Sequence, residues 1–180
     1  MKKTIALLII AILAVMVLFA EALNLGMDFK DCEDPAVTEF LTYIKDNGIL
    51  DERFSYYGIF QDDIGDYYIS FSPVGFGFTN NVQVYFYDGI VEMFWFSDIQ
   101  VDDDNYLYVL YVLNEFANTY TNWVNLFIDN YDGTVSSTTI MSLTGVDDIG
   151  AAVWARFEPF LLLSDIGFES VEDALASPIE

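Results

Sequence analysis

The chain has 180 residues, of which 54% are hydrophobic and 17% aromatic, so it has enough apolar material to form a folded core. It carries 29 acidic and 6 basic residues, a formal net charge of -23. This excess disfavours binding to nucleic acid and to anionic lipid surfaces, because both kinds of binding require Lys and Arg. The sequence contains no histidine and a single cysteine, which excludes His-dependent acid–base catalysis, the usual zinc sites and an intramolecular disulfide.

The first 22 residues have the pattern of an export signal. Lys2 and Lys3 precede an unbroken apolar run over 5–20, and Ala20-Glu21-Ala22 provides a small-x-small cleavage site. We expect a signal peptide over 1–22, cleaved after Ala22, and hence an extracytoplasmic protein, either secreted or periplasmic. The apolar run is longer than a usual signal core and shorter than the roughly 20 residues that span a bilayer. The alternative is therefore an uncleaved membrane anchor over residues 5–20.

Residues 23–33 are interpreted as a polar tether that includes Cys32, and a single domain is expected over 34–180. This domain begins with a helix, for which Asp34 offers an N-cap and Pro35 suits the first helical position. Asn47-Gly48 ends the helix with a left-handed residue. Apolar residues spaced three and four apart predict its buried stripe, which consists of Val37, Phe40, Leu41 and Ile44.

Four strands are expected next, because apolar and polar residues alternate and turn signals separate the segments. The most secure element is a hairpin, since Asp88-Gly89 is a two-residue turn signal between two alternating segments. A Gly-rich loop over 73–81 precedes this hairpin. The expected strands cover residues 54–60, 67–72, 82–87 and 90–96.

The second half predicts a helix over about 105–119, with an apolar stripe from Tyr106 to Tyr120 that includes Leu110. Strands over 123–128 and 134–141 follow. Asp147-Asp148 starts a third helix that runs to about Leu163, with a kink at Pro159, and a capping box over 170–173 starts a last helical turn. The order α-β-β-β-β-α-β-β-α predicts an α+β fold, an antiparallel sheet with helices packed on it.

Three acidic clusters raise the question of calcium binding: Asp62-Asp63-Asp66, Asp102-Asp103-Asp104 and Asp129-Asp132. A calcium loop needs carboxylates at alternating positions, and aligning Asp132-Gly133 to such a loop places Ile128 at the first ligand position. We therefore interpret these carboxylates as helix caps and turn residues, and we expect no metal ion or cofactor.

Two segments predict an interaction surface. If Val124, Leu126 and Ile128 face inward, then Trp123 and Phe127 face outward. The helix over 151–163 has only two charged residues, so it is apolar all round, which predicts burial against its own sheet and against another subunit. The alternative is that the tail over 165–180 covers its outer side. The predicted surface consists of Trp123, Phe127, Trp154, Leu161 and Leu162.

Between residues 36 and 176 the chain resembles a known family. The resemblance is carried by Leu113-Asn114-Glu115-Phe116-Ala117-Asn118, by the segment from Trp123 to Asp129, by the Asp132-Gly133 turn and by the apolar helix that follows. These segments resemble the YbjN-like proteins, a family of bacterial sensory transduction regulators whose fold is similar to type III secretion chaperones. The resemblance implies a small α+β domain that pairs with itself or holds other proteins, and it implies no catalytic residues.

We therefore expect a non-catalytic, extracytoplasmic protein-binding module with a chaperone-like or regulatory role. Its partner is expected to be another protein or a second copy of the chain, with no nucleic acid, and with membrane contact only through an uncleaved N-terminal segment. Two alternatives are a carbohydrate-binding module that uses exposed aromatic side chains and a glycan hydrolase that uses two carboxylates across a cleft.

Overall fold

The computed structural model describes residues 26–78, 80–120 and 122–177. The predicted signal peptide or anchor and residues 23–25 of the predicted tether lie outside the described residues. The elements, in chain order, are η1 (Phe29–Asp31), α2 (Pro35–Asp46), α3 (Ile49–Arg53), β1 (Phe54–Gln61), β2 (Tyr67–Pro73), β3 (Val82–Tyr87), β4 (Ile90–Gln100), α4 (Tyr106–Tyr120), β5 (Asn125–Ile128), β6 (Thr134–Ser142) and α5 (Ile149–Ala176).

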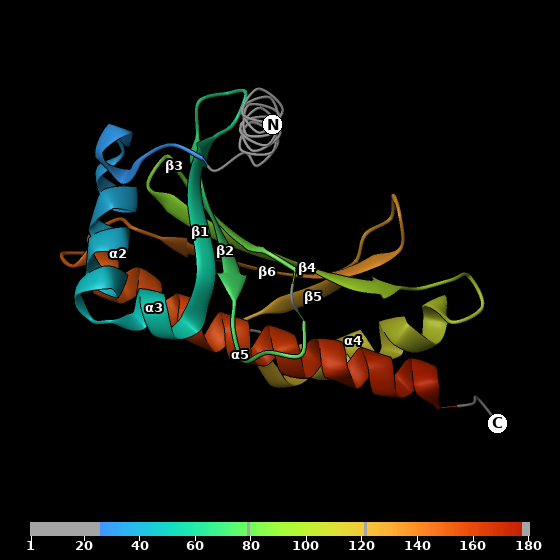
Figure 1. Cartoon of the computed structure of the whole chain (residues 1–180). Helices are drawn as coiled ribbons and strands as arrows, with labels where there is room; N and C mark the ends of the chain where they lie inside the picture. The colour runs from blue at the N-terminus through green and yellow to red at the C-terminus, as the bar shows by residue number, and fades with distance from the viewer. Residues whose placement is uncertain (1–25, 79, 121, 178–180) are drawn as a thin grey trace, which may run out of the picture.

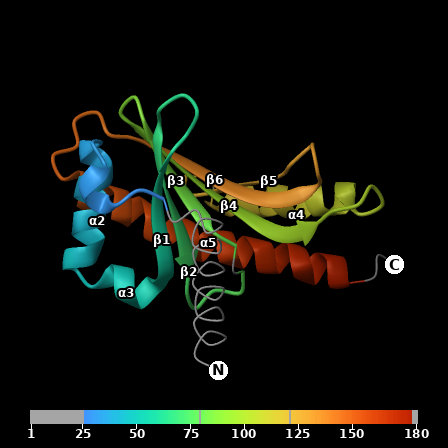
Figure 2. The ribbon, with the colours of Figure 1, turned by 45° about the horizontal axis from the view of Figure 1, so that its top comes forward.

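The six strands form one antiparallel sheet in the order β1-β2-β3-β4-β6-β5. The helices lie on one face of this sheet, with α5 running along it and α2 and α4 packed against α5 (Figures 1 and 2). The predicted α+β class and the predicted order of the main elements are confirmed, and the structure adds the short helices η1 and α3.

The N-terminal helix forms as its sequence predicts. The side chain of Asp34 accepts hydrogen bonds from the backbone N–H groups of Ala36 (2.8 Å) and Val37 (2.9 Å), and Pro35 occupies the first turn. Gly48 follows the helix with a φ of 71°, a left-handed conformation that glycine adopts without strain. The buried side chains of α2 are the four predicted ones: Val37, Phe40, Leu41 and Ile44.

The predicted hairpin joins β3 to β4, and Asp88 and Gly89 both have positive φ values, 47° and 74°, as a tight hairpin turn requires. Strand β4 continues four residues past its expected end, to Gln100. It lies in the middle of the sheet and pairs with β3 on one side and with β6 on the other. This second partner, which is distant in the sequence, explains why the strand is longer than its local pattern predicts.

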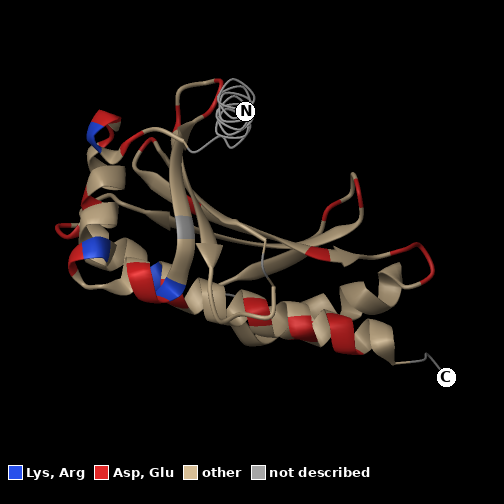
Figure 3. Ribbon diagram, viewed as in Figure 1, with Lys and Arg blue, Asp and Glu red and all other residues tan. Residues whose placement is uncertain are grey.

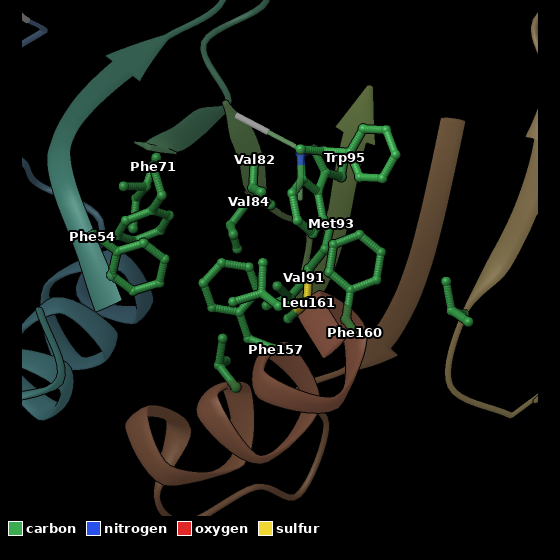
Figure 4. Packing of buried hydrophobic residues seen from close by; sticks show 14 of the residues in the cluster. Phe54, Phe71, Val82, Val84, Val91, Met93, Trp95, Phe157, Phe160 and Leu161 are labelled. Atoms are coloured by element: carbon green, nitrogen blue, oxygen red, sulfur yellow. The ribbon is translucent and has the colours of Figure 1, made fainter. Parts of the chain in front are cut away.

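The core lies between α5 and the sheet (Figure 4). The rings of Phe157 and Phe168 reach the strands, where they contact Phe71 (centroids 5.4 Å apart) and Trp95 (5.6 Å) respectively. All four side chains are fully buried. Removing such a side chain from water stabilises the fold by roughly 1.5–3 kcal/mol, so these contacts are a main source of stability.

The third helix differs from its prediction. It is a single helix of 28 residues that begins after Asp148, whose side chain accepts a hydrogen bond from the N–H of Ala151 (2.8 Å), and it continues past Pro159 and Leu163. The expected end near residue 163 is wrong, and residues 165–176 extend the helix instead of covering its outer side. The helix continues because its buried spacing continues: Ser164, Gly167, Phe168, Val171 and Ala174 all face the core.

Helix α4 is rotated relative to its predicted stripe. Val109, Leu113 and Phe116 are buried as expected, but Leu110 and Tyr106 are 37% and 36% exposed. The helix packs mainly against α5 and β5.

Residues 26–33 do not form the predicted tether. The N–H of Met27 donates a hydrogen bond to the carbonyl of Ile59 in β1 (2.6 Å). Cys32 is buried in the core cluster, and this burial raises the pKa of its thiol. The residue is therefore a packed, unreactive side chain and not part of a mobile leader. In the described part of the chain, no helix has the length and apolar character needed to span a bilayer.

A close approach of α5 to α2 generates a test of this packing. A methyl group added to Gly150 would lie 2.5 Å from the Cβ of Tyr43 and 3.0 Å from the carbonyl oxygen of Glu39. We expect Gly150→Ala to lower the free energy of unfolding by about 1–3 kcal/mol, although alanine favours helix more than glycine does. Urea denaturation would measure the change. Gly77→Ala is the matched control, because its added methyl group meets nothing closer than 3.6 Å, and equal effects of the two changes would contradict the crossing geometry.

Candidate functional site

The face of the sheet opposite the helices is open: no element in residues 26–78, 80–120 and 122–177 lies across it (Figure 1). Side chains alternate along each strand, so the neighbours of core residues such as Val84 and Met93 point to this face. We call it the open face. Its aromatic members are Phe60, Tyr68, Tyr85, Tyr87, Phe94, Phe96 and Phe127.

Five of these rings form a continuous row across four strands, which we call the aromatic row. Phe60, Tyr68 and Tyr85 lie directly opposite one another on β1, β2 and β3, with centroid distances of 5.2 Å and 4.8 Å. The row continues to Phe94, 5.9 Å from Tyr85, and then to Phe96, 6.1 Å further along β4. Three of the four contacts are stacked, with angles between ring planes of 8–20°.

Beyond Phe96 the open face continues to the far edge of the sheet. Phe96 lies opposite Ser136 on β6, and Ser136 lies opposite Phe127 on β5. Phe96 is 39% exposed and Ile140, also on β6, is 55% exposed, while the other rings of the row are half-buried against one another. A run of apolar side chains this long on an uncovered face is typical of a surface that binds a partner.

A tyrosine and a glutamate are paired on the same face. The Tyr87 hydroxyl donates a short hydrogen bond to Oε2 of Glu92 (2.5 Å). This hydrogen bond, together with partial burial and the charges of Glu92 and Asp66, raises the pKa of Tyr87 to about 12. Tyr87 is therefore a neutral donor at physiological pH.

Two hydroxyl groups beside the aromatic row are buried without a hydrogen-bond partner among the described residues. They belong to Ser136 and Thr138 on β6. A buried hydroxyl that makes no hydrogen bond destabilises the fold. By contrast, Ser97 on β4 donates to the carbonyl of Val135 (2.7 Å) and accepts from the N–H of Ile99 (3.1 Å).

The acidic clusters serve turns and helix starts, as the sequence predicts. Asp62 accepts hydrogen bonds from the N–H groups of Ile64 and Asp66 in the β1–β2 turn, and Asp102 accepts one from the N–H of Asn105 before α4. In the β5–β6 turn, Asp129 accepts a hydrogen bond from the N–H of Tyr131, and Asp132 accepts one from the N–H of Thr134.

Two of these clusters, which are separate in the sequence, meet in the fold. A hollow of about 490 Å³, which we call the acidic hollow, lies between the start of α4 and the β5–β6 turn. It is lined by the carboxylates of Asp102, Asp103, Asp129 and Asp132. The hydrogen bond from Thr134 lowers the pKa of Asp132, which is the opposite of what a catalytic acid requires. Within the described ranges, no group of three Asp, Glu or Cys side chains is arranged to hold a metal ion.

The five residues of the predicted interaction surface do not form one surface. Phe127 lies on the open face, as predicted, but Leu161 is 2% exposed and belongs to the core, so its assignment to the surface is wrong. Leu162 is exposed on α5, and Trp154 is half-buried with its ring against Phe157 (6.1 Å). The sheet-facing side of the helix is buried, whereas its outer side exposes apolar side chains such as Leu162 and Ile166, and no other element of the described chain covers them.

Trp123 has a structural partner on the helix side. The guanidinium of Arg156 from α5 lies 5.3 Å from the centre of its ring and also donates to the carbonyl of Asn122 and to the hydroxyl of Thr139. Burial lowers the pKa of Arg156. Arg156 thus connects the loop before β5 to α5 and to the sheet, and Trp123 is 43% exposed, as its predicted outward position requires.

The comparisons with known proteins leave the family open. No protein-family model and no curated protein matches the sequence. Among solved structures, the chain is similar to an uncharacterized protein from Methanothermobacter thermautotrophicus, with 7% identity and a TM-score of 0.43 over 77% of this chain and 97% of that one. A likeness at this level carries no argument about function. The resemblance to the YbjN-like proteins therefore stays a prediction.

The aromatic row itself was not predicted. Its members appear in the sequence only as the outward half of alternating strands, for example Tyr68 and Tyr85. The alternation shows that these aromatic residues share one face of the sheet, but it does not say which face the helices cover.

The unpartnered hydroxyl of Ser136 makes a stability prediction. Ser136→Ala removes a buried group without breaking a hydrogen bond, so the free energy of unfolding should stay unchanged or rise by up to about 1 kcal/mol. Ser97→Ala leaves the N–H of Ile99 without its acceptor and should lower the free energy of unfolding by about 1–3 kcal/mol. Both values follow from urea denaturation. A loss in Ser136→Ala as large as that in Ser97→Ala would contradict the assignment.

The Tyr87–Glu92 pair makes a pH prediction. Because the pKa of Tyr87 is raised to about 12, its stabilising contribution is present below the ordinary tyrosine pKa of about 10 and is lost as the pH rises from about 10 to 12. Glu92→Gln removes the charge and should return the pKa toward 10. Absorbance of phenolate at 295 nm, with Tyr87→Phe subtracted to isolate one residue, would measure it. Identical titration curves for wild type and Glu92→Gln would refute the pairing.

Proposed function

We propose that this chain is a non-catalytic binding domain that holds another protein on the open face of its sheet. The observation that carries the proposal is the aromatic row, which crosses four strands and is uncovered in the part of the chain that the structure describes. Aromatic side chains are enriched at the centres of protein–protein interfaces, because they offer a large rigid contact area at a low cost in conformational entropy.

The way the rings stand supports a protein partner over a carbohydrate. A sugar ring stacks on the exposed flat side of an aromatic ring. In this row Phe60, Tyr68 and Tyr85 stack on each other, with planes within 20° of parallel, so their flat sides are largely occupied. They present their ring edges outward, and the hydroxyl of Tyr85 donates a hydrogen bond to Gln83 (3.2 Å). Such a ribbed surface suits the interleaving side chains of a protein segment.

The carboxylates support a binding role over glycan hydrolysis. A hydrolase needs one carboxyl group with a raised pKa that faces a second carboxylate across a cleft. In the acidic hollow, Asp102, Asp129 and Asp132 accept hydrogen bonds from backbone N–H groups, and the pKa of Asp132 is lowered. These groups shape turns, and Asp66, whose pKa is raised, also lies in a turn, where its N–H donates a hydrogen bond to Asp62 (2.9 Å).

The wider setting is part of the same proposal. A YbjN-like, chaperone-like or regulatory domain that holds proteins agrees with an uncovered apolar sheet face. The signal-like pattern of residues 1–22 supports a domain outside the cytoplasm, either secreted or periplasmic or anchored through residues 5–20. A self-paired form is a competing version, in which the partner on the open face is a second copy of the chain.

Photo-crosslinking tests the proposed face. We expect benzoylphenylalanine at position 96, on the open face, to form an adduct with a single protein in an envelope extract, whereas the same group in place of Leu107, which is 77% exposed on α4, forms none. The adduct protein is then purified and its affinity for the chain is measured by calorimetry.

Paired variants decide the outcome. Phe96→Gln with Ile140→Gln removes two exposed apolar side chains from the open face and should weaken binding by about tenfold or more. Leu162→Gln with Ile166→Gln removes two equally exposed side chains from α5 and should leave affinity within about twofold. Equal losses in the two pairs, or equal adducts at positions 96 and 107, would rule out the open face. An adduct of two copies of the chain would support the self-paired version.

A further inference from the structure

The basic residues of the described chain lie on the helical side of the molecule, whereas carboxylates occur on both sides. The basic residues in the described ranges are Lys30, Lys45, Arg53 and Arg156, and they lie on η1, α2, α3 and α5. The six strands contain no Lys or Arg, and neither do the turns that join them over 62–66, 88–89 and 129–133. Figure 3 shows carboxylates both at the turns of the sheet and along the helices, while the visible basic residues lie on the helices alone.

One acidic group lies at the end of the aromatic row where the β1–β2 and β3–β4 turns meet. Gln61 pairs with Tyr67 and Tyr87 pairs with Ile90, so both turns leave the same end of the strands, close to Tyr68 and Tyr85. These turns carry Asp62, Asp63, Asp66 and Asp88, and Glu92 lies opposite Tyr85 on the open face. Partial burial, and then the charges of Asp62 and Asp88, raise the pKa of Asp66, which indicates that the carboxylates are crowded together.

A second acidic group lies at the other end of the strands. Gln100 pairs with Thr134, whereas Ile90 pairs with Ser142, so the β5–β6 turn leaves the sheet opposite the first two turns. It carries Asp129 and Asp132 and is joined by Asp102 and Asp103 in the acidic hollow. The row runs diagonally from Phe60 on β1 to Phe96 on β4, and the open face continues from there to Phe127 on β5. Between Phe60 and Phe127 the face crosses five strand spacings of ~4.8 Å, about 24 Å across the strands.

We infer that the partner segment on the open face is cationic, with Lys or Arg toward both of its ends and apolar residues between them. This inference rests on the proposed function and specifies its partner. Apolar side chains cover the aromatic row, and the basic ends reach Asp62, Asp66 and Asp88 on one side and Asp129 and Asp132 on the other. An extended segment of about seven residues spans the open face from Phe60 to Phe127.

Charge complementarity also disfavours other occupants. A second copy of the chain has a formal net charge of -23, so it would bring more carboxylates to a face that has no Lys or Arg on its strands. Nucleic acid and anionic lipid headgroups are repelled for the same reason. A basic protein segment is attracted over long range and is then held by apolar contact.

The probe is a labelled peptide with two Lys at each end and about seven alternating Leu and Ser residues between them. Its binding to the full chain is measured by fluorescence anisotropy. We expect binding that weakens several-fold when the salt concentration rises from about 50 to 300 mM, because salt screens exposed charges. A peptide with Glu in place of Lys should not bind, and a peptide with Ser in place of Lys should bind about tenfold more weakly.

Two charge variants with the same net charge provide the control. Asp66→Asn with Asp88→Asn neutralises the end of the row and should weaken binding of the Lys peptide by about three- to tenfold. Glu169→Gln with Glu172→Gln removes the same charge from exposed positions on α5 and should change it by less than about twofold. Equal weakening by both pairs would mean unspecific attraction to an acidic protein and would overturn the inference.

The remaining outcomes separate the inference from the proposed function. If the Ser peptide binds as tightly as the Lys peptide, and Phe96→Gln with Ile140→Gln abolishes both, the cationic partner is refuted while the open face stands. If no peptide binds, the inference fails, and the crosslinking experiment decides about the face independently. If a peptide of residues 1–22, with its Lys2, Lys3 and apolar run, binds more tightly than the probe, the occupant is the chain's own N-terminus and the separate partner is overturned.

Discussion

The contact between α5 and the sheet is the constraint on which the remaining structure depends. This helix of 28 residues covers one face of the sheet through fully buried rings such as Phe157, Phe160 and Phe168. It is also the element against which α2 and α4 pack, so the helices form a single layer. A sheet with a single helical layer has one buried face and one open face. Alternate side chains of each strand therefore face the core and the open side.

The two faces differ in what covers their side chains. Toward α5 the central strands present buried aliphatic residues such as Val84 together with the rings of Phe71 and Trp95, while toward the open side they present stacked rings that no helix of the described chain covers. Polar residues would have been sufficient for a face in water. The rings stabilise each other across strands, since an aromatic pair contributes roughly 0.5–1.5 kcal/mol beyond its buried area. They therefore serve the sheet itself and at the same time leave an apolar surface that a partner protein could cover.

Much of the fold was predictable because local signals and tertiary structure agree. Asp34 and Asp148 cap the helices that their positions predict, and Asp88-Gly89 closes the expected hairpin. The errors arose where the tertiary environment decides. The length of β4 depends on its pairing with β6, and Leu161 was placed on the surface because a nearly uncharged helix does not reveal which side meets the sheet. The open face could not be located for the same reason, since aromatic residues occur on both sides of the alternation.

The geometry of the acidic turns does not require their negative charge. Asp62 accepts two backbone hydrogen bonds in its turn, but an asparagine carbonyl could accept them as well without charge. Asp88 occupies a left-handed position that asparagine also favours. Turn geometry therefore explains why either Asp or Asn is favoured at these positions, but it does not explain why the residue is charged. Burial and then the charges of Asp62 and Asp88 raise the pKa of Asp66 at this end of the aromatic face, and a bound cationic group would offset the repulsion among the three carboxylates.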